Sequence, residues 1–139
     1  MTPLQLEDSF FTALEVRANP AYQHSEEGVL VPQPAIEPRL QVARVKGDQK
    51  RYQLTLTVGS DPDCDEGEPY QIHCQVVGQF VVEEAFERED LDRLVAVNGA
   101  SILYSSLREM VLIVTGRSAW GAVQLPTVNF RRLDIEGNE

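Results

Sequence analysis

Apolar and polar residues alternate along several stretches of the chain, as they do in β-strands with one buried face. The clearest example is residues 52–58, where Tyr, Leu, Leu and Val occupy every second position. Residues 39–46 precede it, and the turn residues 47–50 between the two predict a hairpin. Nearer the start, residues 10–16 alternate in the same way, and Asn19-Pro20 ends the run. We therefore predict a strand in each of these three stretches.

A fourth alternating stretch, residues 70–82, is the longest. Its apolar side begins with Tyr70, Ile72, Cys74 and Val76. We expect Gly78 to introduce a bulge that shifts the alternation, after which Phe80 and Val82 continue the apolar side. Between the first two strands, residues 20–38 contain several prolines, which predicts a surface connection that crosses the sheet.

The second half of the chain changes to the period of a helix. A short helix over residues 89–97 is predicted to end at Asn98-Gly99, because both residues tolerate the left-handed conformation of a C-cap. Ser101 can then cap a long helix that runs to about Thr115-Gly116. Beyond it we expect a loop over residues 118–126.

The long helix is apolar nearly all round. One face carries Leu103, Leu107, Met110, Val111 and Val114, and other faces carry Ile102, Leu112 and Ile113. Such a helix must be covered on both sides, and one short sheet covers only one of them. We therefore expect a second chain, or a bound apolar segment, to cover the other side.

Composition limits the choice of partners. A chain of 139 residues that is 42% hydrophobic predicts a single domain over residues 1–139, with a polar, frayed tail at about residues 131–139. Its net charge of −10 repels nucleic acids and anionic lipids, and could steer a basic partner toward it. Residues 1–8 lack the features of an export signal, and no apolar run is long enough for a membrane span, which favours the cytoplasm.

Residues that could carry chemistry do not form a catalytic or metal-binding pattern. Asp61, Asp63 and Asp65 begin like a calcium loop, but Glu66 and Ile72 stand where that loop needs a glycine and a bidentate glutamate. His73 and Cys74 are adjacent in a strand, so their side chains leave opposite faces. No nucleophile elbow or phosphate-binding loop is present. We expect neither enzymatic activity nor a cofactor or metal.

Several residues of the second half leave two interpretations open. The charged pair Arg108-Glu109 lies in the apolar helix and needs a partner or access to solvent, so an intersubunit or helix-to-sheet salt bridge is one expectation. The aromatic residues Tyr104, Trp120 and Phe130 suit core or interface filling, or a surface that binds peptides.

These segments resemble the SecB protein-export chaperones. The resemblance rests on residues 98–104, on Leu107-Arg108-Glu109 and on residues 125–130, which read Leu-Pro-Thr-Val-Asn-Phe. The strand 70–82 agrees in outline, and the similarity covers roughly residues 16–130.

The resemblance implies an α+β fold with a four-stranded antiparallel sheet and a long helix on one face. It also implies a homo-oligomer, a dimer of dimers whose helices lie between the sheets, although the residues themselves leave dimer and tetramer open. Members hold unfolded or nascent polypeptides in apolar grooves without nucleotide, and deliver them to the translocase motor ATPase through an acidic sheet surface.

Applied to this chain, the resemblance identifies two sets of site residues. The peptide-binding or interface residues are Leu103, Tyr104, Leu107, Met110, Val111, Trp120, Leu125 and Phe130. The surface for the translocase motor is Glu15, His73 and Gln75.

The chain departs from the family pattern at two places. Family members carry a second helix after the Pro-Val-Asn-Phe stretch, whereas a short polar tail follows it here, so part of one groove wall is expected to be missing. His73 and Gln75 replace an apolar and an acidic residue of the motor surface. Two alternatives stay open: a dedicated adaptor or chaperone for one partner, such as an antitoxin, and a small-molecule-binding or enzymatic module that would use the cleft between sheet and helix and the acidic loop.

Overall fold

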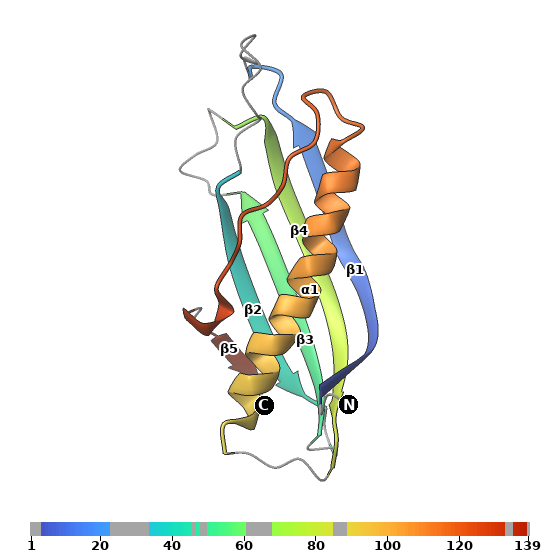
Figure 1. Cartoon of the computed structure of the whole chain (residues 1–139), viewed down its shortest axis with the longest axis vertical. Helices are drawn as coiled ribbons and strands as arrows, with labels where there is room; N and C mark the ends of the chain where they lie inside the picture. The colour runs from blue at the N-terminus through green and yellow to red at the C-terminus, as the bar shows by residue number, and fades with distance from the viewer. Residues whose placement is uncertain are drawn as a thin grey trace.

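The protein is a mainly antiparallel sheet with one long helix across one face (Figure 1). The computed structural model describes residues 4–22, 34–45, 47, 50–60, 68–84, 89–132 and 135–138. The elements are β1 (Leu4–Ala18), β2 (Ile36–Arg44), β3 (Arg51–Ser60), β4 (Tyr70–Val82), α1 (Leu91–Thr115), the 3₁₀ turn η2 (Phe130–Arg132) and β5 (Ile135–Asn138). The strand order is β1-β4-β3-β2-β5. The four predicted strands and their antiparallel pairing are confirmed.

The prediction of a frayed polar tail over residues 131–139 is wrong for part of that range. Residues 130–132 form η2, and β5 pairs with the edge of β2 in a parallel ladder. The sheet therefore has five strands instead of four. An unpaired edge strand offers a row of free backbone donors and acceptors, and this provides the reason for the tail to pair there.

The helix is continuous where two helices were predicted. Residues 91–115 form α1 without a break at Asn98-Gly99, so Gly99 is not a helix cap. A Cβ atom at this glycine would lie 2.5 Å from Cδ2 of Leu54 and 3.3 Å from the ring of Phe80. The absence of a side chain at residue 99 therefore lets α1 approach the sheet closely.

The bulges lie in β1, whereas one was predicted in β4. The pairing of β4 with β3 is continuous through Gly78, which lies opposite Leu54, so the alternation in β4 never shifts. Gly78 instead makes room for Leu103, whose Cδ2 would lie 2.6 Å from an added Cβ. In β1 the register with β4 shifts between Leu6 and Asp8 and again between Phe11 and Ala13, so Glu7 and Thr12 are the extra residues of two bulges.

Between these two bulges, the side chains of β1 point to the opposite faces of the sheet from those that strict alternation predicts. Phe10 pairs with Val77 and points away from α1, whereas Leu14 pairs with the core residue Cys74 and points toward it. The predicted alternation in residues 10–16 therefore fails at Phe10, because Thr12 is an extra residue between the two.

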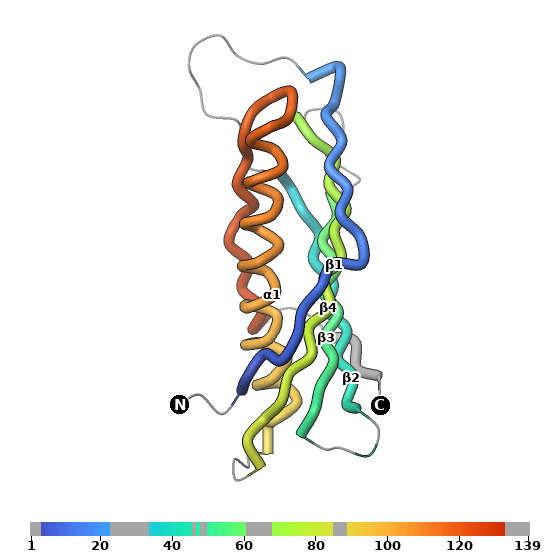
Figure 2. The backbone as a smooth tube through the Cα atoms, turned by 90° about the vertical axis from the view of Figure 1, so that its right-hand side faces the viewer, coloured from blue at the N-terminus to red at the C-terminus, as the bar shows by residue number. Residues whose placement is uncertain are grey.

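The core lies between α1 and the sheet, and Figure 2 shows these two layers from the side of β1. Fully buried side chains with large volumes come from every layer: Tyr52, Tyr70, Phe80, Leu40, Leu54, Leu56, Leu103, Leu107 and Leu125. After α1 the chain turns and runs back along the helix on the side of β2 as an extended segment (Figure 1). We call residues 121–129 the return segment.

Helix side chains hold the backbone of the return segment. Tyr104 donates its hydroxyl to the carbonyl of Pro126, and Arg108 Nε donates to the carbonyl of Leu125 at 2.8 Å. The hydroxyl of Thr115 accepts from the amide of Val123 at 3.0 Å. Because Arg108 bonds a carbonyl in this way, it fastens the return segment, and no helix-to-sheet salt bridge is formed by it among the described residues.

Candidate functional site

One flank of α1 and the neighbouring face of β1 leave apolar side chains open to solvent. We call Leu6, Leu14, Ile102, Met110 and Ile113 together the α1–β1 apolar surface. Ile113 is 55% exposed, Ile102 39%, and the two leucines of β1 about as much as Ile102. Tyr104, Arg108 and Thr115 face the return segment on the side of β2, so the opposite flank of the helix turns toward β1.

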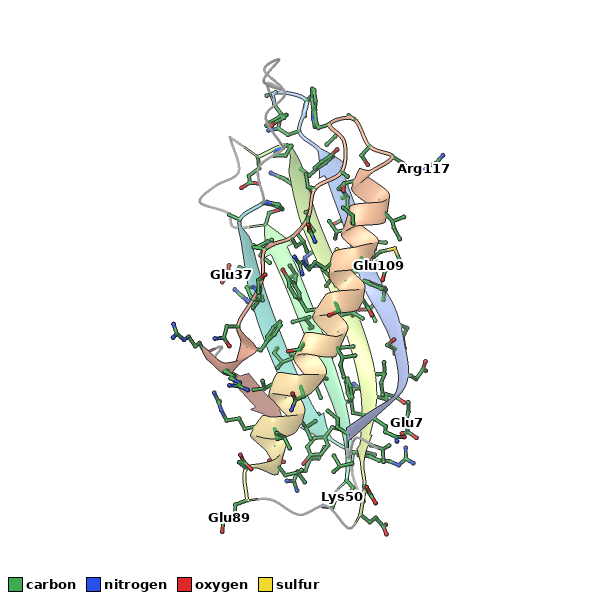
Figure 3. The ribbon with its side chains drawn as sticks, viewed as in Figure 1. Glu7, Glu37, Lys50, Glu89, Glu109 and Arg117 are labelled. Atoms are coloured by element: carbon green, nitrogen blue, oxygen red, sulfur yellow. The ribbon has the colours of Figure 1, made fainter. Side chains whose placement is uncertain are left out.

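Pairing in the sheet places the β1 members of this surface. Leu6 lies opposite Phe80 and Leu14 opposite Cys74, and both partners belong to the face on which α1 packs. Glu109 extends from the same flank of the helix (Figure 3) and is exposed. An exposed apolar strip with a charged margin is typical of a surface that binds another polypeptide.

The residues predicted for peptide binding or an interface divide into two groups. Six are buried inside the protein: Leu103, Tyr104, Leu107, Val111, Leu125 and Phe130. Tyr104 and Phe130 contact each other edge to face, with ring centroids 5.6 Å apart. Met110 and Trp120 are partly exposed. Of the predicted set, these two are therefore the most accessible to a partner.

Leu6 and Leu14 were not among the predicted site residues. Leu6 continues an alternation of Leu4, Gln5, Leu6 and Glu7 that could have extended the first strand toward the N-terminus. Leu14 belonged to the predicted strand, but its exposure depends on where α1 crosses the sheet. Ile102 and Ile113 were placed correctly on faces of the helix outside the main apolar face.

Trp120 joins the end of β1 to the turn after α1. Its indole Nε1 donates to the carbonyl of Asn19 at 2.9 Å, and its amide donates to the hydroxyl of Tyr70 at 2.9 Å. Tyr22 packs edge to face against the indole at 5.3 Å between ring centroids. Since the chain contains a single tryptophan, its fluorescence reports on this corner alone.

A charged cluster fastens the first turn of α1 to the β2–β3 hairpin. Tyr52 donates its hydroxyl to Oδ1 of Asp92 at 2.6 Å, and Arg44 Nε donates to the same oxygen at 2.9 Å. Burial tends to raise the pKa of Asp92, but the bonds from Tyr52 and Arg44 outweigh it and lower that pKa. Burial, followed by the bond to Asp92, raises the pKa of Tyr52 to about 12.

The cluster predicts a pH-dependent contribution to stability. An acid with a lowered pKa stabilises the fold above its ordinary pKa of about 4, and this stabilisation is lost as the pH falls further. We expect Tyr52→Phe to lower the free energy of unfolding by about 1 kcal/mol at neutral pH, because the bond is partly exposed. Urea unfolding of both proteins between pH 2 and 8 measures the difference, which should shrink below pH 4. A difference that is constant across this range would contradict the role given to Asp92.

The residues predicted for the translocase motor share the face of the sheet opposite α1. Glu15 lies directly opposite His73 in the β1–β4 pairing. Gln75 accepts a bond from Thr12 at 2.7 Å and donates one to Thr57 at 2.9 Å, so its amide is held in place. Glu15 and His73 also line an open hollow of about 300 Å³, together with Arg17, Gly59, Ser60 and Gln71.

Several candidates from the sequence fall outside the described residues. His24, Cys64 and the acidic residues 61, 63 and 65 are among them. In the parts of the chain that the structure describes, no group of three or more His, Cys, Asp or Glu side chains could hold a metal ion. Cys74 is buried, which raises its pKa to about 11 and keeps it a thiol. Among the described helices, none is both long enough and apolar enough to cross a membrane.

Comparison with known proteins agrees with this architecture. The family model described as preprotein translocase subunit SecB matches residues 5–136. No curated protein matches the sequence significantly.

Several solved structures share the fold, among them one from Mycobacterium tuberculosis and one from Streptococcus agalactiae. The Mycobacterium tuberculosis SecB-like chaperone Rv1957, in complex with a ChAD peptide from the HigA1 antitoxin, superposes with a TM-score of 0.58 at 14% identity, over 91% of this chain and 88% of that one. A protein of unknown function from Streptococcus agalactiae superposes with a TM-score of 0.56 at 16% identity, over 89% of this chain and 97% of that one.

Proposed function

Because this chain belongs to the SecB family of chaperones, which are not enzymes, we propose that it is a holdase that binds unfolded polypeptides without ATP. The observation that carries the proposal is the α1–β1 apolar surface, which the protein's own sheet and return segment leave uncovered. Apolar surface gains about 25 cal/mol for each Å² that a bound segment covers, and it requires no particular side-chain code. Such a surface accepts many sequences.

We propose that the same regions mediate assembly into a homo-oligomer, with a dimer of dimers as the family's arrangement. Ile102, Leu112 and Ile113 are exposed on the helix, and β1 is an edge strand of 15 residues. An isolated edge strand of this length favours pairing with another chain. In such an assembly, subunits would cover part of the apolar surface, and the remaining part would hold clients.

Suppression of aggregation tests the holding function. Reduced α-lactalbumin unfolds and aggregates at room temperature. Its aggregation can be followed by light scattering in the presence of increasing amounts of this protein. We expect scattering to be suppressed at about one protein assembly per client, without nucleotide. The intrinsic fluorescence of Trp120 provides a second signal if clients contact the corner that it forms with Asn19 and Tyr22. Unchanged scattering at a tenfold excess would contradict the proposal.

A dedicated chaperone for one partner is the second candidate. The structural neighbour from Mycobacterium tuberculosis was solved with a peptide of an antitoxin, which shows that a protein of this fold can hold a specific segment. Binding constants for a panel of unrelated unfolded segments separate the two candidates. Similar constants across the panel support the general holdase, whereas one tight ligand among non-binders supports the dedicated chaperone.

We propose the face opposite α1 as the surface for a second partner, which for an export chaperone is the translocase motor. The support is that Glu15 and His73 line an open hollow on the face that also carries Gln75, together with the net charge of −10. Because this face lies on the other side of the sheet, a partner there would not compete directly with a client on the α1–β1 apolar surface.

We propose that the protein acts in the cytoplasm. The support is that its two cysteines do not form a disulfide framework.

A further inference from the structure

The outer edge of β2 presents backbone groups with which a further strand can pair. Val45 donates its amide to Arg51 in the hairpin at 2.8 Å. Successive residues of a strand direct their backbone N–H and C=O groups to opposite edges. Since Val45 bonds β3, the backbone groups of the odd-numbered residues of β2 face β3 and those of the even-numbered residues face the outer edge. Pro38 is even-numbered, so its missing amide costs no bond to β3, as is usual for proline in an edge strand. At the outer edge Pro38 has no amide to donate, so the stretch that can accept a further strand is residues 40–44.

The chain's own C-terminal strand occupies this stretch. Leu40 pairs with Ile135, and the parallel ladder continues to Ala43 and Asn138 (Figure 1). Because the backbone groups of Leu40 and Val42 face the outer edge, the register requires the amides of Glu136 and Asn138 to face β2, while that of Gly137 faces away. Recognition here is thus between two backbones.

The occupant is short and its pairing is of the weaker kind. It has four residues, and a parallel ladder is slightly less stable for each residue than an antiparallel one. What favours it is that it belongs to the same chain, which gives it a high effective concentration. A segment from another polypeptide could replace it by forming an antiparallel ladder along the same backbone groups.

We propose that the outer edge of β2 is a second binding site for extended segments of unfolded polypeptides, and that β5 occupies it in competition with them. This inference rests on the proposed function and adds a regulated site to it. The partner's chemistry follows from the sheet. Alternate side chains of an added strand point to the face where α1 packs, and the others point to the opposite, polar face. The edge therefore fits a segment in which apolar and polar residues alternate.

The proline positions in β5 supply a matched pair of variants in the full-length protein. Glu136→Pro removes an amide that faces β2, whereas Gly137→Pro removes one that faces away, and Glu136→Gln controls for the lost charge. Asn138→Pro is a second variant of the first kind. The probe is a fluorescein-labelled peptide of alternating valine and threonine with lysine at both ends, measured by anisotropy. A second copy of the peptide carries N-methyl groups on alternate residues, which removes the amides of one edge.

We expect Glu136→Pro and Asn138→Pro to bind the peptide at least about threefold more tightly than Gly137→Pro, because removal of an internal competitor raises the fraction of binding-competent protein. For the N-methylated peptide, the affinities of these variants and of Gly137→Pro should be equal. Equal affinities across the proline variants, or an N-methylated peptide that gains equally, would overturn the inference. Failure of the wild-type protein to hold α-lactalbumin would instead overturn the proposed function, since that assay compares no β5 variants and tests holding with β5 in place.

Discussion

Replacing Ile113 with glutamate is expected to abolish both assembly and client holding while the fold stays intact. Ile113 is the most exposed of the large apolar side chains on the described surface, at 55%. A partner that covers it in the wild type would have to bury a carboxylate in the variant, and an unpaired buried charge costs several kcal/mol. The variant protein itself keeps residue 113 in solvent, so its own unfolding should change little.

Val45→Glu is the matched control. Val45 is also an exposed apolar residue, at 43%, but it follows β2 near the hairpin, away from the α1–β1 apolar surface. Both variants change the net charge equally, so a difference between them reports on position. Light scattering gives the oligomeric state, α-lactalbumin aggregation gives holding, and thermal unfolding verifies the fold. An Ile113→Glu protein that still assembles and holds its client would contradict the role assigned to this surface.

Gly99→Leu is expected to lower the free energy of unfolding by about 3 kcal/mol, near the upper end of overpacking costs. Helix propensity alone predicts the opposite sign, since leucine is favoured over glycine inside a helix by nearly 1 kcal/mol. The clash decides, because an added Cβ would lie 2.5 Å from Leu54 and 3.3 Å from the ring of Phe80, which are both fully buried. The leucine must therefore push α1 away from the sheet. Thermal unfolding should shift down by about 10 °C.

Gly59→Leu provides the comparison for this prediction. Gly59 lies in β3 on the face opposite α1, where an added Cβ would meet nothing closer than 3.9 Å. The same substitution should leave stability within about 0.5 kcal/mol of the wild type, as is usual for a surface change. Equal losses at residues 99 and 59 would show that close packing of the helix is not the cause.

The difference between these two glycines illustrates what sequence patterns could and could not predict. Asn98-Gly99 suits a helix end as well as a close helix-to-sheet contact, because both need a residue without a side chain. Only the position of Leu54 and Phe80 beneath α1 distinguishes the two. The bulges of β1 are a similar case, since the extra residues Glu7 and Thr12 are defined only by the register of the partner strand β4.

The site was predictable to a limited degree for the same reason. An excess of apolar residues on α1 was visible from helical periodicity, and Ile102 and Ile113 are indeed exposed. Which residues of that helix are open, however, depends on what lies over each flank. Tyr104 and Leu107 are buried because the sheet and the return segment cover their side, and the return segment is held by Tyr104, Arg108 and Thr115 across gaps of 8 to 22 residues.

The sequence by itself determined the positions of four strands, the helical segment in the second half and the surplus of apolar residues on it, because each of these follows from a local period of two or of 3.6 residues. Tertiary structure decided the continuity of α1, the face of the sheet to which the Phe10 side chain points, the pairing of β5 with β2 and the location of the open apolar surface. These features depend on which segments meet in space. Contacts between residues far apart in the chain leave no periodic signal in either segment alone.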